Sequence, residues 1–369
     1  MTVERTVRLH FDEHARDAGT HTNLSAVRSD GAVLWLAGDE TATIERLVAD
    51  DAGTPTTYDR QTSYRLADLV DLPGDDADEE ADVEGIARQG HFLWATGSHS
   101  LRRRQIKQQH SGDKALRRLA KVTGQANRQV LVRIPVAEVD GLPTLVRELE
   151  VDGVRHRAAV FGTHGDDLRD LLADDEHLAV FLPIPGKDNG LDIEGVAVAG
   201  ERVYLGLRGP VLRGWAVVLE LRPVVDPRHP DRLVLTPFAD GRRYRKHVLR
   251  MNGLGVRDLC PHEDDLLVLA GPTMDLDGPV HVFRWHGALT AETPQVVRGD
   301  DLTLEVDLPF GIGDDHAEGI GLLCPDDGER LLVVYDSPAP TRLGTDGWVT
   351  ADVVRLPVRD PAATSHPEG

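Results

Sequence analysis

The chain has 369 residues, with 41 basic and 62 acidic side chains and a formal net charge of −21. This length allows a large core or one repeat-built domain, and the acidic balance argues against general binding to nucleic acid or anionic membranes. The first residues lack a basic stretch followed by an apolar one, and no apolar run approaches the ~18 residues of a membrane helix. We therefore expect a cytoplasmic protein without a membrane span.

Segments of similar pattern recur in chain order. Each contains a short strand, a turn rich in Gly, Asp or Pro, and a second strand that is apolar on both faces, which is typical of a β-hairpin inside a covered sheet. The segments begin at Thr22, Ala81, Leu191, Leu254 and Asp315. Three of the four intervals are close to ~60 residues, which leaves room for four strands per unit, as in a β-propeller.

Further apolar stretches predict the outer strands of each unit. Third strands are expected within 41–49, 128–136, 215–224, 280–287 and 348–358, and fourth strands within 63–73, 177–185, 245–253 and 302–310. The last unit lacks a fourth strand, and residues 5–13 have the matching pattern, so the N-terminal strand is predicted to complete it. We expect an all-β fold: a β-propeller over residues 1–357 with five recognisable four-stranded blades and a disordered tail at 358–369.

The second interval is long, which indicates insertions. Residues 100–124 and 166–178 are predicted to be helical, the second capped by Asp166 or Asp167, with a β-hairpin between them. A degenerate sixth blade in this interval is an alternative. The first insertion is strongly basic but has no aromatic residue for base stacking, so we expect a solvated helix or a surface for a protein partner rather than a nucleic-acid site.

One polar residue occupies the same aligned position in the first strand of each unit. These residues are Ser25, Glu84, Glu194, Arg257 and Glu318. In a propeller the first strands surround the central channel, so these side chains are expected to converge near one mouth, joined by Asp192, two residues before Glu194 on the same strand face. A Gly follows each Glu, where the backbones are expected to crowd the axis.

Carboxylates that lie close together repel each other, so their negative charge must be offset, and several arrangements can do this. A Ca²⁺ ion held by Glu84, Asp192, Glu194 and Glu318 is one, and pairing with Arg257 is a second. Partial protonation is a third, and it suits acid–base catalysis by Glu194 or His316. Each Glu is alternatively a structural residue that accepts hydrogen bonds from the backbone of the next blade.

Further polar residues are expected at the same rim. Ser25, His99, Lys187, Arg208 and Arg257 are the candidate ligand-binding residues, and the cations among them suit a small anionic or phosphorylated molecule. The sequence therefore indicates either a hydrolase of small esters, lactones or phosphoesters, or a non-catalytic propeller that binds a ligand or a protein. Cys260 and Cys324 have no metal-type spacing and are expected to be buried thiols.

Several segments together resemble a bacterial family of uncharacterised proteins, the domain of unknown function 3616. They are NLSAV, DVEGIA, GSHS, GKDNGLDIEGVAV, YLGLRGPVLRGWA, GVRDL and HAEGI, spread from about Asn23 to Leu356. This resemblance implies no activity. More distantly, the repeated Glu-Gly strands are similar to the phytase-like esterase domain and to calcium-dependent lactonase and phosphotriesterase propellers. That similarity implies Glu84, Glu194 and Glu318 as calcium ligands, whereas Ser25 and Arg257 depart from the pattern.

Overall fold

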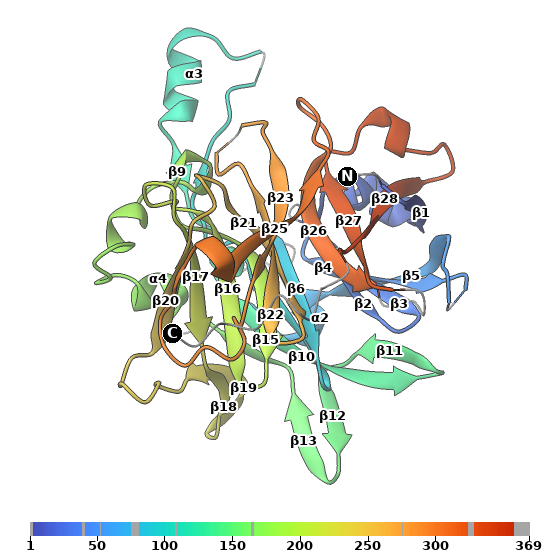
Figure 1. Cartoon of the computed structure of the whole chain (residues 1–369), viewed down its shortest axis with the longest axis horizontal. Coiled ribbons are helices and arrows are strands. Elements are labelled where there is room, and N and C mark those ends of the chain that lie inside the picture. The colour runs from blue at the N-terminus through green and yellow to red at the C-terminus, as the bar shows by residue number, and fades with distance from the viewer. Residues whose placement is uncertain are drawn as a thin grey trace.

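The computed structural model describes residues 3–38, 41–51, 53–74, 81–107, 109–163, 166–274, 276–323 and 328–357. Its regular structure is mainly β, in sheets arranged around a common axis as in a β-propeller (Figure 1). The α-helices of the described residues are α1 (Glu13–Asp17), α2 (Leu66–Leu69), α3 (Gly112–Leu119) and α4 (Leu168–Leu171). The 3-10 helices are η1 (Thr20–Thr22), η2 (Ala126–Arg128), η3 (Ala179–Phe181), η4 (Gly186–Asp188), η5 (Gly299–Asp301) and η6 (Pro340–Arg342).

Each recurring segment of the sequence begins one sheet unit, and its strands pair in chain order. The first unit is β2 (Leu24–Asp30), β3 (Val33–Gly38), β4 (Thr43–Ala49) and β5 (Thr57–Arg65). The second is β6 (Val83–Gln89), β7 (Phe92–Gly97), β10 (Leu131–Val139) and β14 (Ala159–Phe161). The third is β15 (Asp192–Ala199), β16 (Arg202–Gly209), β17 (Ala216–Leu221) and β20 (Tyr244–Leu249), with β24 (Val296–Val297) added in parallel.

The fourth unit is β21 (Gly255–His262), β22 (Asp265–Gly271), β23 (Val280–Trp285) and β25 (Leu302–Leu308). The last is β26 (His316–Leu323), β27 (Arg330–Asp336), β28 (Trp348–Arg355) and β1 (Arg5–His10). The remaining strands are β8 (Arg102–Arg103), β9 (Val122–Thr123), β11 (Leu142–Leu145), β12 (Glu148–Val151), β13 (Val154–Arg157), β18 (Pro223–Asp226) and β19 (His229–Leu235).

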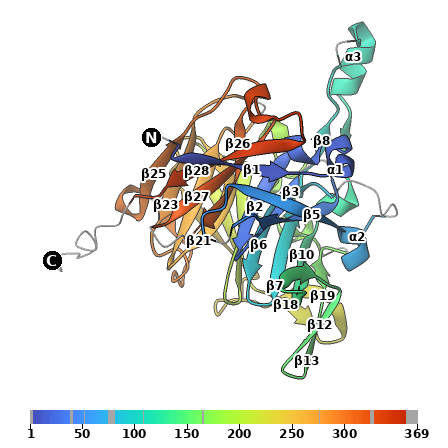
Figure 2. The same ribbon diagram turned by 90° about the vertical axis from the view of Figure 1, so that its right-hand side faces the viewer.

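The N-terminal strand completes the last unit, as predicted. β1 pairs antiparallel with β28 over its whole length, from Arg5 opposite Val353 to His10 opposite Trp348. Its other edge pairs in parallel with β5, where Arg8 lies opposite Thr57. The strand therefore joins the first and last units in one continuous sheet, and Figure 2 shows β1 beside β28 and β5.

The first strands of the units form a closed ring, in which β2 contacts β6, β6 contacts β15, β15 contacts β21, β21 contacts β26 and β26 contacts β2. The apolar core is divided among the spaces between neighbouring units. On β3, Leu34 and Leu36 pack toward the last unit, whereas Trp35 and Ala37 pack toward the second. Second strands are apolar on both faces because both faces are covered.

Two of the fourth strands were predicted at the wrong positions in the chain. Within 63–73 the strand ends at Arg65, and α2 follows because Leu66 and Leu69, three residues apart, bury the same helix face. Residues 177–185 contain η3 instead of a strand. The Asp175 carboxylate accepts hydrogen bonds from the Leu178 and His177 backbone N–H groups and starts a turn, and Pro183 and Pro185 cannot donate to a ladder. β14 takes the fourth position instead, and β19 of the next unit pairs with it.

The predicted insertions are present with less helix than expected. Within 100–124 only α3 is α-helical, and it has no buried residue. Within 166–178 the helix is α4, capped by Asp167, whose carboxylate accepts a hydrogen bond from the Asp170 N–H at 2.9 Å. The hairpin between them is β12–β13. No helix of the described residues is long and apolar enough to cross a membrane.

Two sequence predictions extend beyond the part of the chain that the structure describes. The tail at 358–369 and Cys324 both lie outside the described residues. Cys260 is buried, as expected, in the core between the fourth and last units.

Candidate functional site

The aligned polar position is a β-bulge in every unit. The register between the first and second strands skips one residue between Leu24 and Ala26, Val83 and Gly85, Ile193 and Gly195, Val256 and Asp258, and Ala317 and Gly319. The skipped residues are Ser25, Glu84, Glu194, Arg257 and Glu318, which we call the bulge column. A bulge leaves one residue out of the ladder and re-aims its side chain. The backbone therefore presents one side chain per unit at the same level of the ring of inner strands, and the type of residue differs among the units.

The Gly after each Glu lies where neighbouring inner strands approach most closely. A Cβ atom at Gly85 would lie 3.0 Å from the Glu194 carbonyl oxygen, and one at Gly195 would lie 3.0 Å from the Leu259 nitrogen. At Gly319 it would lie 2.9 Å from the Ala26 Cα. The expected crowding at the axis is confirmed, since no larger side chain fits without movement of the backbone.

A buried ion pair joins the inner strands close to the bulge column. The Arg28 guanidinium donates from Nη1 to Asp258 Oδ2 at 2.8 Å and from Nη2 to Asp258 Oδ1 at 2.7 Å. Arg28 also donates to the carbonyl oxygens of Val196, Leu259 and Ile320, which belong to three other inner strands. Both side chains are almost fully buried. The pair therefore links four of the five inner strands, β2, β15, β21 and β26.

Four members of the bulge column line a cavity of about 1200 Å³, and we call the side formed by the inner strands its floor. Eight of the residues singled out in the sequence line it, from the bulge column and the neighbouring loops. They are Glu84, Lys187, Asp192, Glu194, Arg208, Arg257, His316 and Glu318. The predicted convergence of these residues, hundreds of positions apart in the chain, is what the structure shows.

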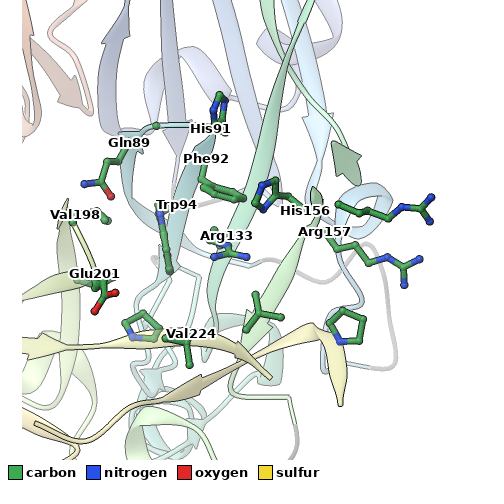
Figure 3. Close-up of a pocket in the computed structure, with 17 residues that line it drawn as sticks. Gln89, His91, Phe92, Trp94, Arg133, His156, Arg157, Val198, Glu201 and Val224 are labelled. Atoms are coloured by element: carbon green, nitrogen blue, oxygen red, sulfur yellow. The ribbon is translucent and has the colours of Figure 1, made fainter. Parts of the chain in front are cut away.

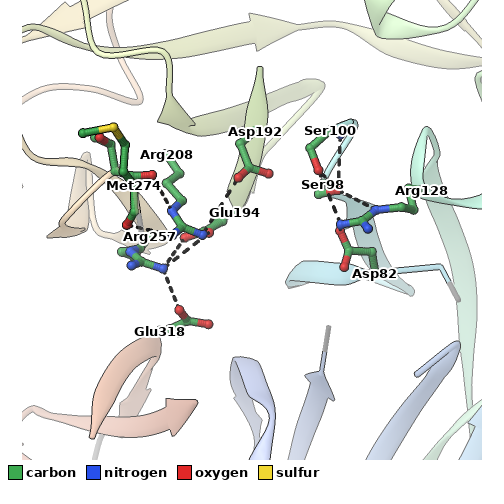
Figure 4. Close-up of polar contacts among 11 residues, drawn as sticks. Asp82, Ser98, Ser100, Arg128, Asp192, Glu194, Arg208, Arg257, Met274 and Glu318 are labelled. Carbon is green, nitrogen blue, oxygen red and sulfur yellow. Dashed lines mark hydrogen bonds and ion pairs between the residues drawn. The ribbon is translucent and has the colours of Figure 1, made fainter. Parts of the chain in front are cut away.

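The charged residues on the cavity floor alternate in sign (Figure 4). Arg257 Nη1 lies 2.6 Å from Glu318 Oε1 and 3.1 Å from Glu194 Oε2. Arg208 Nη1 lies 2.7 Å from Glu194 Oε1 and 3.9 Å from Asp192 Oδ2. We call this set, Glu318–Arg257–Glu194–Arg208–Asp192, the ion-pair chain. It holds three acids and two bases, so it carries one excess negative charge when all five are ionised.

Arg208 is positioned from outside the bulge column. It lies at the end of β16, and its Nε donates to the Thr273 carbonyl oxygen at 2.9 Å, while Nη2 donates to that of Met274 at 3.3 Å. These bonds fix the guanidinium between Glu194 and Asp192. The neighbouring carboxylates raise the pKa of Arg208, so it stays charged.

Burial shifts the two ends of the ion-pair chain toward the protonated form. Desolvation raises the pKa of Asp192 to about 7, against the opposing effect of Arg208. Desolvation also raises the pKa of Glu318 to about 8, against that of Arg257. Near neutral pH, these two carboxyl groups therefore take up and release a proton, which is the property that general acid–base chemistry requires.

A second buried ion pair lies on the wall of the cavity beside this chain. Arg128 pairs with Asp82, and its Nε donates to Ser98 Oγ at 3.2 Å. Ser98 and Ser100 are joined by a hydrogen bond of 3.0 Å between their hydroxyl oxygens. Sequence reasoning did not identify Arg128 as a site residue, because its partner is 46 positions away and nothing local marks the pair.

His316 and Lys187 lie at the rim of the cavity rather than on its floor. His316 Nε2 is 3.0 Å from Asp277 Oδ1, and about a third of its side chain is exposed. Lys187 is exposed on η4. Both are placed to meet a ligand that enters, whereas Asp192 and Glu318 are placed to meet one that is fully inside.

Ser25 and His99 do not line the cavity. Ser25 belongs to the bulge column, but its hydroxyl is buried and has no hydrogen-bond partner among the described residues. His99 is fully buried, and desolvation lowers its pKa to about 3, so it is neutral. A direct role of either side chain in ligand binding has no geometric support.

The basic insertion forms one wall of the cavity. Arg102, Arg103, Arg104, Lys107 and Arg118 all line it, and Arg103 is anchored by an ion pair of 2.7 Å to Asp188 on η4. From the sequence we expected this segment to be a solvated helix or a surface for a protein partner. The helix α3 itself does project from the molecule (Figure 1), but the residues before it, and Arg118 on it, face the same space as the acidic floor.

The arrangement of the carboxylates does not fit a calcium ion. The described residues contain no group of three or more His, Cys, Asp or Glu side chains close enough to share a metal. Both Glu194 oxygens and one Glu318 oxygen face guanidinium groups instead. Of the compensations considered for the sequence, the geometry therefore favours the ion pairs with Arg257 and partial protonation.

Comparison with models of protein families shows to which family the chain belongs. Residues 23–352 match the model described as "Protein of unknown function (DUF3616)". The match covers nearly all of the described sheets, so the protein belongs to this family, as its motifs suggested. No curated protein matches the chain.

Solved structures that resemble the chain are distant. The PQQ-bound aldose sugar dehydrogenase from Streptomyces coelicolor is 13% identical with a TM-score of 0.38, covering 96% of this chain and 99% of that one. The major allergen Mala s 1 from Malassezia sympodialis is 8% identical with a TM-score of 0.42, covering 96% of both chains. A putative 6-phosphogluconolactonase from Bacteroides uniformis is 13% identical with a TM-score of 0.30, covering 83% of this chain and 62% of that one.

Proposed function

We propose that this protein is a five-bladed β-propeller whose cavity binds a small organic anion and hydrolyses an ester, lactone or phosphoester bond in it. The observation that supports this most directly is the ion-pair chain, which ends in two buried carboxyl groups, Asp192 and Glu318, with pKa values near neutrality. Groups that exchange a proton near the working pH are effective general acids and bases.

The cations of the cavity suit the other needs of such a reaction. Arg102, Arg104 and Lys187 on the walls attract an anionic substrate, and no ion pair in the described residues neutralises Arg104 or Lys187. Arg208 and Arg257 on the floor offer guanidinium groups to the negative charge that develops on the attacked carbonyl or phosphoryl oxygen. A water molecule activated by Asp192 or Glu318 would then be the nucleophile, and the other carboxyl group would protonate the leaving oxygen.

The test is a panel of small anionic esters, lactones and phosphomonoesters, assayed with the protein purified in the presence of a chelator. We expect turnover that persists in the chelator and falls by ~10²-fold or more in Asp192→Asn and in Glu318→Gln. Asp231→Asn, at an exposed site on β19, is the matched control and should retain full activity. Turnover that needs added Ca²⁺, or that survives both substitutions, would contradict the proposal.

A non-catalytic ligand-binding propeller is the second candidate. It is favoured by one observation: both Glu194 oxygens are already held by arginines, which suits a rigid binding floor. Titration calorimetry with the same panel separates the two. Binding that is unchanged in Asp192→Asn, together with no turnover of any panel compound by the wild type, would establish the binding function and exclude the hydrolase.

A further inference from the structure

A second cavity lies at the opposite end of the inner strands. Its volume is about 690 Å³, and it lies between the second and third units. Glu84 and Glu194 stand near the beginning of β6 and β15, whereas this cavity is lined by the turns at their ends, around Gln89 and Gly200. The two cavities therefore do not share a wall on these strands. Figure 3 shows the lining side chains.

A cation without a counter-ion stands in this second cavity. Arg133 on β10 is half-buried, and desolvation lowers its pKa. Its guanidinium carbon lies 4.2 Å from the centre of the Phe92 ring and 5.9 Å from that of Trp94. Within the described residues, the Arg133 side chain makes no hydrogen bond or ion pair, and its Nε is buried without a partner.

The other stacked arginines of the described residues differ from Arg133 in this respect. Arg245 lies over Phe238 and pairs with Glu220 at 3.5 Å, and Arg250 lies over Trp215 and donates to the Arg213 carbonyl oxygen at 3.2 Å. Arg342 lies over Tyr335 but is paired with Asp315 and Asp352. Arg222 lies near Phe238 and is paired with Glu201. Arg8 lies over Trp348 at 5.2 Å and is exposed to solvent, which screens its charge. A guanidinium that is half-buried and unpaired loses part of its hydration without compensation, so a bound anion would offset that loss.

The rest of the lining indicates what kind of anion fits. Val198, Val203 and Val224 give one side an apolar wall, and the Phe92 ring faces His156 edge-on at 5.3 Å. Glu201 is the single carboxylate among the lining residues, and it is already paired with Arg222 at 2.8 Å. An inorganic anion would leave the apolar wall uncovered, and a neutral apolar molecule would leave Arg133 unpaired.

We infer that this second cavity is a binding site for an organic carboxylate with a flat apolar body, held by Arg133 through its carboxylate and by Phe92, Trp94 and Val224 through its body. A carboxylate matches the paired N–H groups along the edge of a guanidinium whose face is stacked on a ring. Arg155 and Arg157 also line the cavity, and together they exceed the charge of Glu148, with which both pair, by one. The site is independent of the proposed hydrolase activity.

The test is titration calorimetry of the full chain with 2-naphthoate, and with 2-naphthamide as its uncharged counterpart. We expect 2-naphthoate to bind at least ~10-fold more tightly than the amide, and Arg133→Gln to remove that preference. Arg8→Gln, which changes an exposed stacked arginine, should leave it intact. Asp192→Asn should also leave it intact, which separates this site from the cavity above the bulge column.

A second measurement does not depend on any loss of binding by a variant. Because the uncompensated charge is costly, Arg133→Met should melt at a higher temperature than the wild type in the absence of ligand. It should gain no further stability from 2-naphthoate, whereas the wild type should. Equal affinity of naphthoate and naphthamide for the wild type, no detectable binding of naphthoate, or naphthoate binding retained by Arg133→Gln would overturn the inference.

Discussion

At the scale of single residues, the bulge column decides the charge of the cavity floor. Glu194 and Glu318 are both drawn toward Arg257, the one basic member of the column, and Arg208 adds a second cation from β16. With Asp192 at the far end, the acids exceed the bases by one. Burial resolves that excess by favouring a proton on Asp192 or Glu318, so charge and protonation at the site are set together.

This proton predicts how stability depends on pH. The folded-state pKa of Glu318, about 8, lies above its ordinary value of 4.5, so between these limits the folded protein holds a proton that the unfolded chain has released. The free energy of unfolding therefore falls as pH rises through this window, by on the order of a few kcal/mol. We expect Glu318→Gln, which cannot ionise, to melt with a weaker dependence on pH between pH 5 and 8.

Thermal melts of the wild type and the variant at several pH values provide the measurement. The exposed carboxyl variant Asp231→Asn is the control and should follow the wild type. If Glu318→Gln and the wild type lost stability in parallel from pH 5 to 8, Glu318 would not be the group that holds the proton.

The sequence predicted which residues meet at the cavity floor, but it left open which of them pair with each other. Glu84, Glu194, Arg257 and Glu318 were found because repetition marks them, and repetition also placed them at one mouth. Arg28 lies on an inner strand but has no counterpart in the other units, so nothing marked it as the partner of Asp258. The bulges themselves leave no trace in an alignment, because the extra residue is present in every unit.

At the scale of elements, the inner strands approach each other more closely than side chains normally allow. On β26, a Cβ atom at Gly319 would lie 2.8 Å from Val334 Cγ2 and 2.9 Å from the Ala26 Cα, whereas one at Gly321 would have the Val27 carbonyl oxygen, at 3.4 Å, as its nearest neighbour. The two glycines are on the same strand and the same face, two residues apart. Alanine at either position therefore changes strand propensity alike, and the two variants differ in how closely the new methyl group approaches its neighbours.

We expect Gly319→Ala to destabilise the protein by ~1–3 kcal/mol, because the backbone of β2 must move away from the new methyl group. Gly321→Ala should change stability by less than ~1 kcal/mol, since its methyl group makes ordinary contacts. Chemical denaturation of both variants measures the difference. Equal loss in the two variants would mean that the close approach at Gly319 is not under strain.

The prediction of elements failed where local capping competed with apolar pattern. Inner, second and third strands were located because each is long, apolar and followed by a turn. Residues 177–185 are equally apolar, but Asp175 caps a turn there and two prolines remove ladder donors. The fourth strand β14 has three residues, too few for its periodicity to be detected.

At the scale of the whole molecule, β1 holds the ring closed. It satisfies the outer edge of β28 and also one edge of β5, so its removal would expose two strands that are buried in the intact sheet. Deletion of residues 1–12 should lower the melting temperature by more than ~10 °C and promote association through the freed edges.

Thermal melts and light scattering measure these effects. Replacement of the β12–β13 hairpin by a short Gly-Ser loop removes a similar number of residues and is the control, because that hairpin pairs only with itself. A truncated protein that melts with the wild type and remains monodisperse would show that β1 does not hold the ring.

The position of β1 also has a consequence for the order in which the chain is synthesised. The ribosome makes β1 long before its antiparallel partner β28, which begins only at Trp348. At typical rates of ~5–20 residues per second, β1 waits on the order of 20–70 seconds for that partner. During that interval its alternating apolar side chains, Val7 and Leu9, are available to chaperones or to another nascent chain, and the final blade is the last to mature.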